Sequence, residues 1–426
     1  MKPFYLKPML FDTLKGYTKN QFLRDLTAGI IVAIIALPLS IALALASGVE
    51  PAAGIYTAIA AGFVVSLLGG SAVQIAGPTA AFATIVAGIV AAKGTEGLII
   101  ATLIAGLVLI LMGICKLGGL VRFIPKSVTV GFTSGIAVTI LLGQIKDFLG
   151  LVYAEGLKPV ETVEKLEANF ASLSTLSLPA LLVGAVSLAI LILYPRIEKR
   201  VPPSLVAVLV GALLVLFVPG FGDVATIGKL YTVKAGLPPF TLGGIDWSLE
   251  KVLSLVPDAM TIAILAAIES LLSCVVADTM VNSKHNSNAE LVAQGAGNIL
   301  SVMFGGIPAT GAIARTAANA KNGGRTPVAG MVHALVLFLV LLVLMPLASL
   351  IPMPTIAAVL FMVAYNMSEW RSFLKLVKTS PVTDILVLIL TFLFTVIFDL
   401  VVAIAVGMSL HLIFLLVLRL KKKKNA

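Results

Sequence analysis

Apolar segments long enough to cross a lipid bilayer follow one another along almost the whole chain. A membrane-spanning helix needs about 20 mainly apolar residues, and only 12% of the 426 residues are charged, compared with about a quarter in soluble domains. We therefore predict an all-α polytopic membrane protein with about fourteen transmembrane segments. These segments are 26–47, 52–69, 74–92, 97–115, 124–146, 176–194, 203–219, 252–277, 289–303, 311–321, 328–350, 353–366, 382–398 and 400–419.

The positive charges predict how the chain lies in the membrane. Loops on the cytoplasmic side retain Lys and Arg, and most of the 30 Lys and Arg fall on one side when the N-terminus is placed inside. This predicts a cytoplasmic arm over 1–24, a transport domain over 25–419 and a basic cytoplasmic tail over 420–426. The tail would contact anionic membrane lipid. The net charge of +10 then reflects topology, and we expect no nucleic-acid partner.

Two matching segments indicate an inverted repeat. Fourteen segments divide into two sets of seven, about 25–219 and 246–419, and an odd number makes the second set enter the membrane in the opposite sense. The third segment contains Pro78 and Thr79, and Pro308 and Thr310 lie just before the tenth; in both places a helix rich in small residues follows. Proline suits the first turn of a helix and interrupts what precedes it. We expect segments 3 and 10 to be short broken helices of the kind that form transporter sites.

The tenth segment carries a positive charge at membrane depth. A helix over 311–321 would begin in mid-membrane, where its free N–H groups and positive dipole end can bind an anion. Arg315 lies one turn inside that helix, and its guanidinium offers a planar set of donors to an oxyanion. Two alternatives remain open. The Gly- and Ala-rich helices could serve close packing, and Arg315 could form a structural ion pair with an acid in the membrane.

The eighth segment supplies such an acid. Glu269 lies near the middle of "VPDAMTIAILAAIESLLSCVVAD" (256–278), and Ser273 follows on the same helical face. A carboxylate inside a membrane commonly marks a proton or ion pathway, so Glu269 is a candidate proton carrier. No Walker-type phosphate loop or zincin motif is present in the sequence, so transport would be driven by ion gradients, and we predict no cofactor.

Four stretches of the chain resemble the sulfate permease family of anion transporters. They are "QIAGPTAAF" (74–82), "AIESLLSCVVAD" (267–278), "NSNAELVAQGAGNI" (286–299) and "IPATGAIARTAANAKNGGRTPVAG" (307–330). The resemblance extends in order and spacing over essentially the whole chain. It implies a seven-plus-seven inverted repeat with a core and a gate domain, which transports an anion by an elevator-like motion, here in the bacterial plasma membrane.

The resemblance also implies a set of site residues. The anion would bind at Gln74, Pro78, Thr79, Ala80, Gly311, Ala312, Ile313, Ala314 and Arg315. Sodium-coupled bicarbonate members bind Na⁺ through an acid and a hydroxyl matching Glu269 and Ser273, and through the start of helix ten. Here Ile313 replaces a hydroxyl ligand and Arg315 adds positive charge nearby, so we favour proton coupling. Family members usually continue into a cytoplasmic STAS domain, whereas this sequence ends at "RLKKKKNA"; we expect a truncated chain or a form without that domain, and homodimerisation stays open.

Several other functions are weighed against proton-coupled anion symport. Sodium-coupled bicarbonate symport, uncoupled exchange or passive conductance would use the same fold. A nucleobase transporter would place acids, not Arg315, beside the broken helices. An enzyme would need a nucleophile–base or metal constellation in the spans, and a sensor would need a signalling domain; the sequence indicates neither.

Overall fold

The structure is a computed structural model that describes residues 6–119, 125–157, 159, 161–198, 201–232, 236–398, 402–403, 406–411 and 413–414. Half of the predicted segment 400–419, all of the basic tail 420–426 and the first five residues of the N-terminal arm lie outside the described residues.

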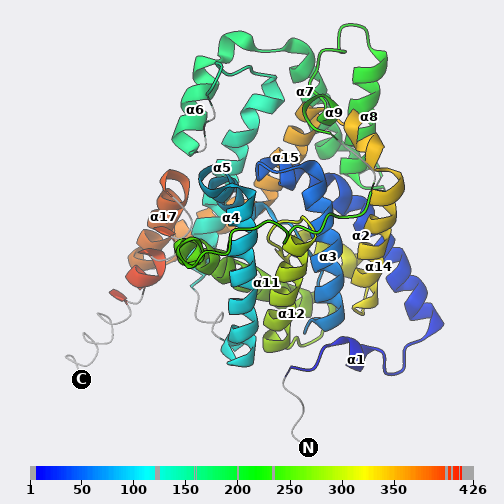
Figure 1. Cartoon of the computed structure of the whole chain (residues 1–426), viewed down its shortest axis with the longest axis vertical. Coiled ribbons are helices and arrows are strands. Elements are labelled where there is room, and N and C mark those ends of the chain that lie inside the picture. Colours follow the sequence, from blue (N-terminus) through cyan, green and yellow to red (C-terminus); the bar gives the residue numbers. More distant parts are fainter. Residues whose placement is uncertain are drawn as a thin grey trace, which may run out of the picture.

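Helices make up nearly all of the regular structure (Figure 1). The first half contains α1 (Leu10–Thr13), α2 (Lys19–Ala46), α3 (Pro51–Leu68), β1 (Ala76–Gly77), α4 (Ala80–Ile114), α5 (Lys126–Leu149), α6 (Thr162–Ala171), a 3-10 turn (Leu173–Thr175), α7 (Leu178–Ile197) and α8 (Pro203–Phe217). After α9 (Ile227–Leu230) and α10 (Leu249–Ser254), the second half contains α11 (Val256–Val281), α12 (Ser287–Met303), β2 (Thr310–Gly311), α13 (Ile313–Lys321), α14 (Val328–Val343), a 3-10 helix (Met345–Leu350), α15 (Met353–Met367), α16 (Trp370–Thr379) and α17 (Val382–Ile397).

The lengths of these helices agree with a membrane protein. Among the described residues, α2, α3, α4, α5, α7 and α11 are each long and apolar enough to cross a membrane. Three shorter apolar helices, α8, α14 and α17, accompany them. The predicted all-α polytopic class is confirmed, and the described helices fit two sets of seven in an inverted repeat.

The helices form two groups. The core bundle consists of α2, α3, α4, α11, α12, α13 and α14, and the gate bundle consists of α5, α6, α7, α8, α15, α16 and α17. Packing is most extensive within each group, for example between α4 and α12 and between α5 and α15. The two bundles meet mainly where α2 contacts α15 and α8, and where α4 contacts α5.

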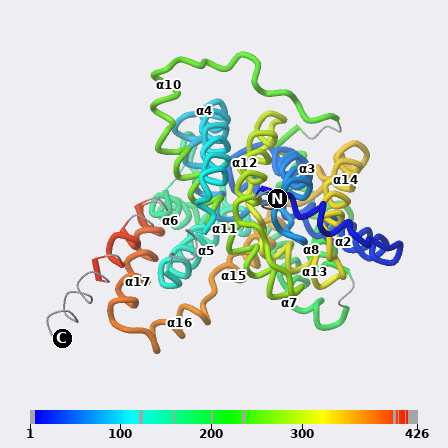
Figure 2. The backbone as a smooth tube through the Cα atoms, turned by 90° about the horizontal axis from the view of Figure 1, so that it is seen from below, coloured from blue at the N-terminus to red at the C-terminus, as the bar shows by residue number. Residues whose placement is uncertain are grey.

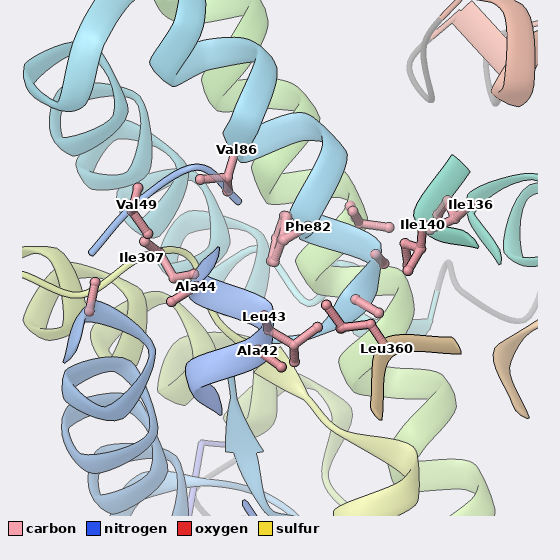
Figure 3. Packing of buried hydrophobic residues seen from close by; sticks show 14 of the residues in the cluster. Ala42, Leu43, Ala44, Val49, Phe82, Val86, Ile136, Ile140, Ile307 and Leu360 are labelled. Carbon is pink, nitrogen blue, oxygen red and sulfur yellow. The ribbon is translucent and has the colours of Figure 1, made fainter. Parts of the chain in front are cut away.

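An apolar cluster fills the meeting place of the two bundles (Figure 3). Leu43 of α2 and Phe82 of α4 come from the core bundle, and Ile136 of α5 and Leu360 of α15 come from the gate bundle. All four side chains are almost fully buried. Dispersion contacts between these apolar side chains hold the two bundles together at this place.

Two very short strands connect the halves of the chain inside the core bundle. β1 and β2 pair antiparallel, with Ala76 opposite Gly311 and Gly77 opposite Thr310. A proline ends the extended run before α4, and another precedes β2. The pairing brings the starts of α4 and α13 together although they are more than 200 residues apart in sequence, so the predicted interruption of segments 3 and 10 is present.

The structure agrees with one predicted boundary and differs at others. The third and fourth predicted segments both lie within α4, and the break expected between them is present at Gly94, where φ is 69° and the backbone leaves the helical conformation. The helix predicted over 311–321 begins at Ile313, because Thr310 and Gly311 belong to β2. The sequence analysis assigned no helix to α6 or α16.

Candidate functional site

The N-termini of α4 and α13 lie side by side in the core bundle because β1 and β2 pair just before them. Thr79 precedes the first turn of α4 and Ala312 precedes that of α13, and neither helix start receives a hydrogen bond from a capping side chain. The first N–H groups of a helix have no partner within the helix. The two starts therefore present free donors and the positive ends of two helix dipoles in one region.

Glu269 of α11 sits at this junction and is only partly exposed. Its Oε2 accepts hydrogen bonds from the hydroxyls of Thr79 and Thr310, each at 2.9 Å. The two hydroxyl oxygens are 3.2 Å apart. One carboxylate thus contacts the residue before α4 and a residue of β2, and it joins the two matching Pro-Thr pairs that the sequence analysis identified.

Thr310 was absent from the predicted set of site residues. The repeated Pro-Thr pattern was the available signal, because it includes both Thr79 and Thr310, whereas the family resemblance supplied Thr79 alone. The pattern alone did not place either hydroxyl against Glu269, because that contact joins elements separated by 190 residues for Thr79 and by 41 for Thr310.

Arg315 lies behind the strand pair and is 1% exposed. Its Nη2 donates to the backbone carbonyl of Pro78, while Nε and Nη1 have no hydrogen-bond partner in the structure as described. A side chain at Gly77 would collide with the guanidinium, so this approach requires glycine. No described carboxylate lies within 4.0 Å of Arg315. The structural ion pair considered above is therefore not formed with Glu269 or with another acid in the described part of the chain.

The predicted anion-binding residues surround this junction but differ in exposure. Ile313, at 44%, and Ala314 are exposed at the start of α13, and Thr79 is partly exposed. Ala80, Ala312, Pro78 and Gly311 are buried. A ligand at the helix starts would therefore meet the backbone around Ile313 and Ala314 directly. The positive charge of Arg315, which is buried, would attract such a ligand from a greater distance.

Gln74 lies against Gly311 of β2 and binds a second acid. Its Nε2 donates to Oε1 of Glu290 at 2.6 Å, and its Oε1 lies 3.1 Å from Sγ of Cys274. Glu290 is fully buried and also accepts from the N–H of Gly70 and from Nε2 of Gln294. This acid was missing from the sequence-based site, although Glu290 and Gln294 lie four residues apart in the stretch "NAELVAQ", which places both on one helical face.

Two serines of α11 hold the elements around the site: Ser270 binds β2, and Ser273 binds α13. Ser270 Oγ accepts the backbone N–H of Gly311 at 3.0 Å, and Ser273 Oγ donates to Thr316 at 3.3 Å. Thr316 in turn accepts the N–H of Ile75. Both serines are fully buried. The predicted partner of Glu269 in ion coupling therefore faces a hydrogen-bond chain inside the core, and that coupling role stays a prediction.

Comparisons with known proteins agree with the architecture. A model of the sulfate permease family matches residues 22–391. "Putative sulfate transporter YvdB" of Bacillus subtilis is 44% identical over 94% of this chain and 74% of its own length. "Bicarbonate transporter BicA" of a Picosynechococcus species is 34% identical over 89% of this chain and 67% of its own.

Solved structures agree as well. The transmembrane domain of a cyanobacterial bicarbonate transporter, BicA, matches 91% of this chain and 98% of its own, with a TM-score of 0.81 and 31% identity. The murine anion transporter Solute Carrier 26 family member A9 has a TM-score of 0.85 over 98% of this chain and 72% of its own, at 18% identity, which shows the common fold. These matches, together with the paired broken helices, show that this chain belongs to the sulfate permease family of membrane transport proteins.

Proposed function

We propose that this protein is a secondary active transporter of small anions that works as a proton-coupled symporter with an elevator-like motion of the core bundle against the gate bundle. The observation that carries this proposal is the meeting of two uncapped helix starts beside Glu269, next to the buried guanidinium of Arg315, whose Nε and Nη1 have no partner among the described residues. Sulfate or bicarbonate is the proposed substrate class, in keeping with the names of the relatives, and a dicarboxylate would suit the same donors.

Binding of the anion follows from the electrostatics of the junction. Free N–H groups at the starts of α4 and α13 can donate to an oxyanion, and both dipoles favour negative charge there. The charge of Arg315 adds to this field, since charges interact strongly where water is largely excluded. The anion would contact the backbone near Ile313 and Ala314, which are exposed.

Glu269 provides the coupling. An ionised carboxylate next to the helix starts repels an anion at the same place and competes for the same positive field. Protonation removes that repulsion, so the anion and the proton each favour the binding of the other. Thr79 and Thr310 can follow this change because a hydroxyl donates to the carboxylate and can accept from the carboxylic acid. The two species would then cross the membrane together.

Sodium coupling is the second candidate, and one contact favours it. Glu269 Oε2 and the hydroxyl oxygens of Thr79 and Thr310 lie 2.9 to 3.2 Å from one another. Hard cations prefer such oxygen ligands, and Na⁺ would neutralise Glu269 as a proton does. This set of oxygens differs from the one that the family resemblance implied, because Ser273 is directed to Thr316.

Orientation completes the proposal. The distribution of Lys and Arg favours cytoplasmic N- and C-termini in the bacterial plasma membrane. A cysteine-accessibility experiment on intact cells, with single cysteines introduced near residue 15 and in the 153–157 loop, tests it: the first should be protected and the second labelled by a membrane-impermeant reagent.

Uptake into proteoliposomes tests the function. Unlabelled sulfate, bicarbonate, fumarate, nitrate and chloride are competed against labelled sulfate or bicarbonate, with either a pH gradient or a Na⁺ gradient imposed. Accumulation driven by the pH gradient in Na⁺-free buffer supports proton symport, and accumulation that requires Na⁺ supports the second candidate. Equilibration without accumulation under either gradient would reject symport in favour of exchange or conductance. Absence of saturable uptake of every anion would reject anion transport.

A further inference from the structure

The ten-residue helix α16 (Trp370–Thr379) differs from the other helices of the gate bundle. It connects the end of α15 to the start of α17 and lies at the margin of the molecule in Figure 2. Glu369, immediately before it, adopts φ 44°, which turns the chain sharply between α15 and α16. Not one of its ten residues is fully buried. A helix too short to span a membrane is thus held between two apolar helices, at the level where they end.

One side of α16 packs on the protein. Phe373 meets Phe392 of α17 edge to face, with 5.5 Å between ring centroids. By helical spacing, the same side of the helix carries Leu376 and Val377. Both are partly buried. These contacts fix the rotation of the helix about its own axis.

The rest of the apolar surface has no protein cover. Trp370 is 43% exposed and Leu374 is 46% exposed. They lie one turn apart, on the same edge of the helix. Exposed large apolar residues beside a membrane-spanning bundle indicate contact with lipid. Tryptophan in particular is enriched at the level of the lipid headgroups.

A row of cations lies next to that apolar edge. Arg371, Lys375 and Lys378 are all exposed, and their spacing places them on one side of the helix, opposite Phe373. None of them forms an ion pair with a described acid. The guanidinium of Arg371 lies 5.2 Å from the centre of the Trp370 ring. Basic and apolar edges in contact along one short helix are typical of a helix that lies in the membrane–water interface.

We propose that α16 lies in the interface and that Arg371, Lys375 and Lys378 bind the headgroups of anionic phospholipids. The charges are complementary, the apolar edge fits the acyl-chain boundary, and the two attached helices hold α16 at the membrane surface. Because α16 belongs to the gate bundle, this contact anchors that bundle to the lipid surface.

The chain offers its own reporter for this contact. It contains two tryptophans, and Trp247 lies on an exposed loop, so Trp247→Phe leaves Trp370 as the single fluorophore. The variant is reconstituted into vesicles of phosphatidylcholine and phosphatidylglycerol, in which either lipid carries bromine on its acyl chains and quenches nearby tryptophan. Each cation near an anionic surface favours it by about fivefold. We therefore expect at least about twice the quenching from brominated phosphatidylglycerol as from brominated phosphatidylcholine at equal mole fraction.

Matched variants separate charge from structure. In the Trp247→Phe background, Lys375→Gln with Lys378→Gln should equalise quenching by the two lipids. Lys375→Arg with Lys378→Arg should keep the preference. Arg371 stays in both because it contacts the reporter. Equal quenching by the two lipids in the Trp247→Phe protein would overturn the anionic-lipid proposal. A lack of quenching by either lipid would place α16 in water or under protein and would overturn its interfacial position too.

Discussion

The carboxylate of Glu269 accepts the hydroxyl of Thr310 at 2.9 Å, and this contact links α11 to the strand that leads into α13. Through Thr79, the same oxygen reaches the residue before α4. An acid that contacts both halves of the pseudo-symmetric site can respond to what binds at either helix start.

Replacing Glu269 with glutamine should uncouple transport. The amide keeps the shape, and its carbonyl oxygen can accept from both threonines, but it cannot gain or lose a proton. The anion should therefore still bind at the helix starts. In proteoliposomes, we expect saturable binding within about threefold of the parent protein, while accumulation driven by a pH gradient falls to equilibration. Accumulation above equilibrium in Glu269→Gln under the same gradient would contradict the assignment of the coupling group.

The two threonines should act through their hydroxyls. Thr79→Val and Thr310→Val preserve shape but remove one donor each, and a hydrogen bond to a charged group contributes about 1.5–3 kcal/mol. We expect each variant to shift the pH dependence of uptake and the double variant to shift it further. Thr79→Ser and Thr310→Ser are the matched controls and should resemble the parent. If the pH profile of uptake is unchanged in the valine variants, the hydrogen bonds from Thr79 and Thr310 to Glu269 have only a structural role.

Glu290 should act as a positioning residue for Gln74. The carboxylate fixes the amide by accepting its Nε2 at 2.6 Å, and Gln74 abuts the backbone of Gly311. Glu290→Gln leaves Gln74 free to reverse its amide, so the apparent affinity for the anion should weaken by about tenfold, with a smaller change in maximal rate. Glu290→Asp, which restores charge at a shorter reach, should recover part of the affinity. An unchanged affinity in folded Glu290→Gln protein would refute this role.

Asp25 should contribute to stability and not to coupling. It is fully buried and accepts from Tyr17, Gln21, Thr326 and the backbone of Arg325, so it ties α2 to the loop after α13. Asp25→Asn replaces one acceptor oxygen by a donor, and we expect a loss of about 2 kcal/mol or more in unfolding free energy. Thermal unfolding in detergent measures this, and an unchanged Tm would contradict it.

The hydrogen bond from Tyr17 to Asp25 can also be tested from the side of the tyrosine. Burial, assisted by the hydrogen bond to Asp25, raises the pKa of Tyr17 to about 12. The folded pKa exceeds the ordinary value of about 10, so this contribution to stability is complete below pH 10 and is lost as the pH rises toward 12. Tyr17→Phe should remove that part of the alkaline destabilisation, and an identical pH profile in the two proteins would argue against it.

The sequence predicted the architecture better than the contacts. Pro78 and Pro308, each followed closely by a threonine, predicted two interrupted segments, since proline leaves a local mark in the chain. The pairing of Ala76 with Gly311 could not be predicted, because a strand of two residues has no periodic pattern. For the same reason the sequence did not show that Arg315 donates to the carbonyl of Pro78.

The α16 helix was missed for a different reason. A search for about 20 apolar residues overlooks a ten-residue helix in which three residues are basic. Its pattern was present in "WRSFLKLVKT" (370–379), where apolar and basic residues recur at helical spacing, and a test for that period would have identified it.

A density map of the reconstituted protein, recorded with and without the most effective competing anion from the uptake screen, tests the central claim most directly. We predict new density between the starts of α4 and α13, within hydrogen-bond reach of the backbone N–H groups of Ile313 and Ala314, in the parent protein. The same density should be lost in Arg315→Ala and kept in Arg315→Lys. Anion density elsewhere, or equal occupancy of this position in Arg315→Ala, would contradict the account.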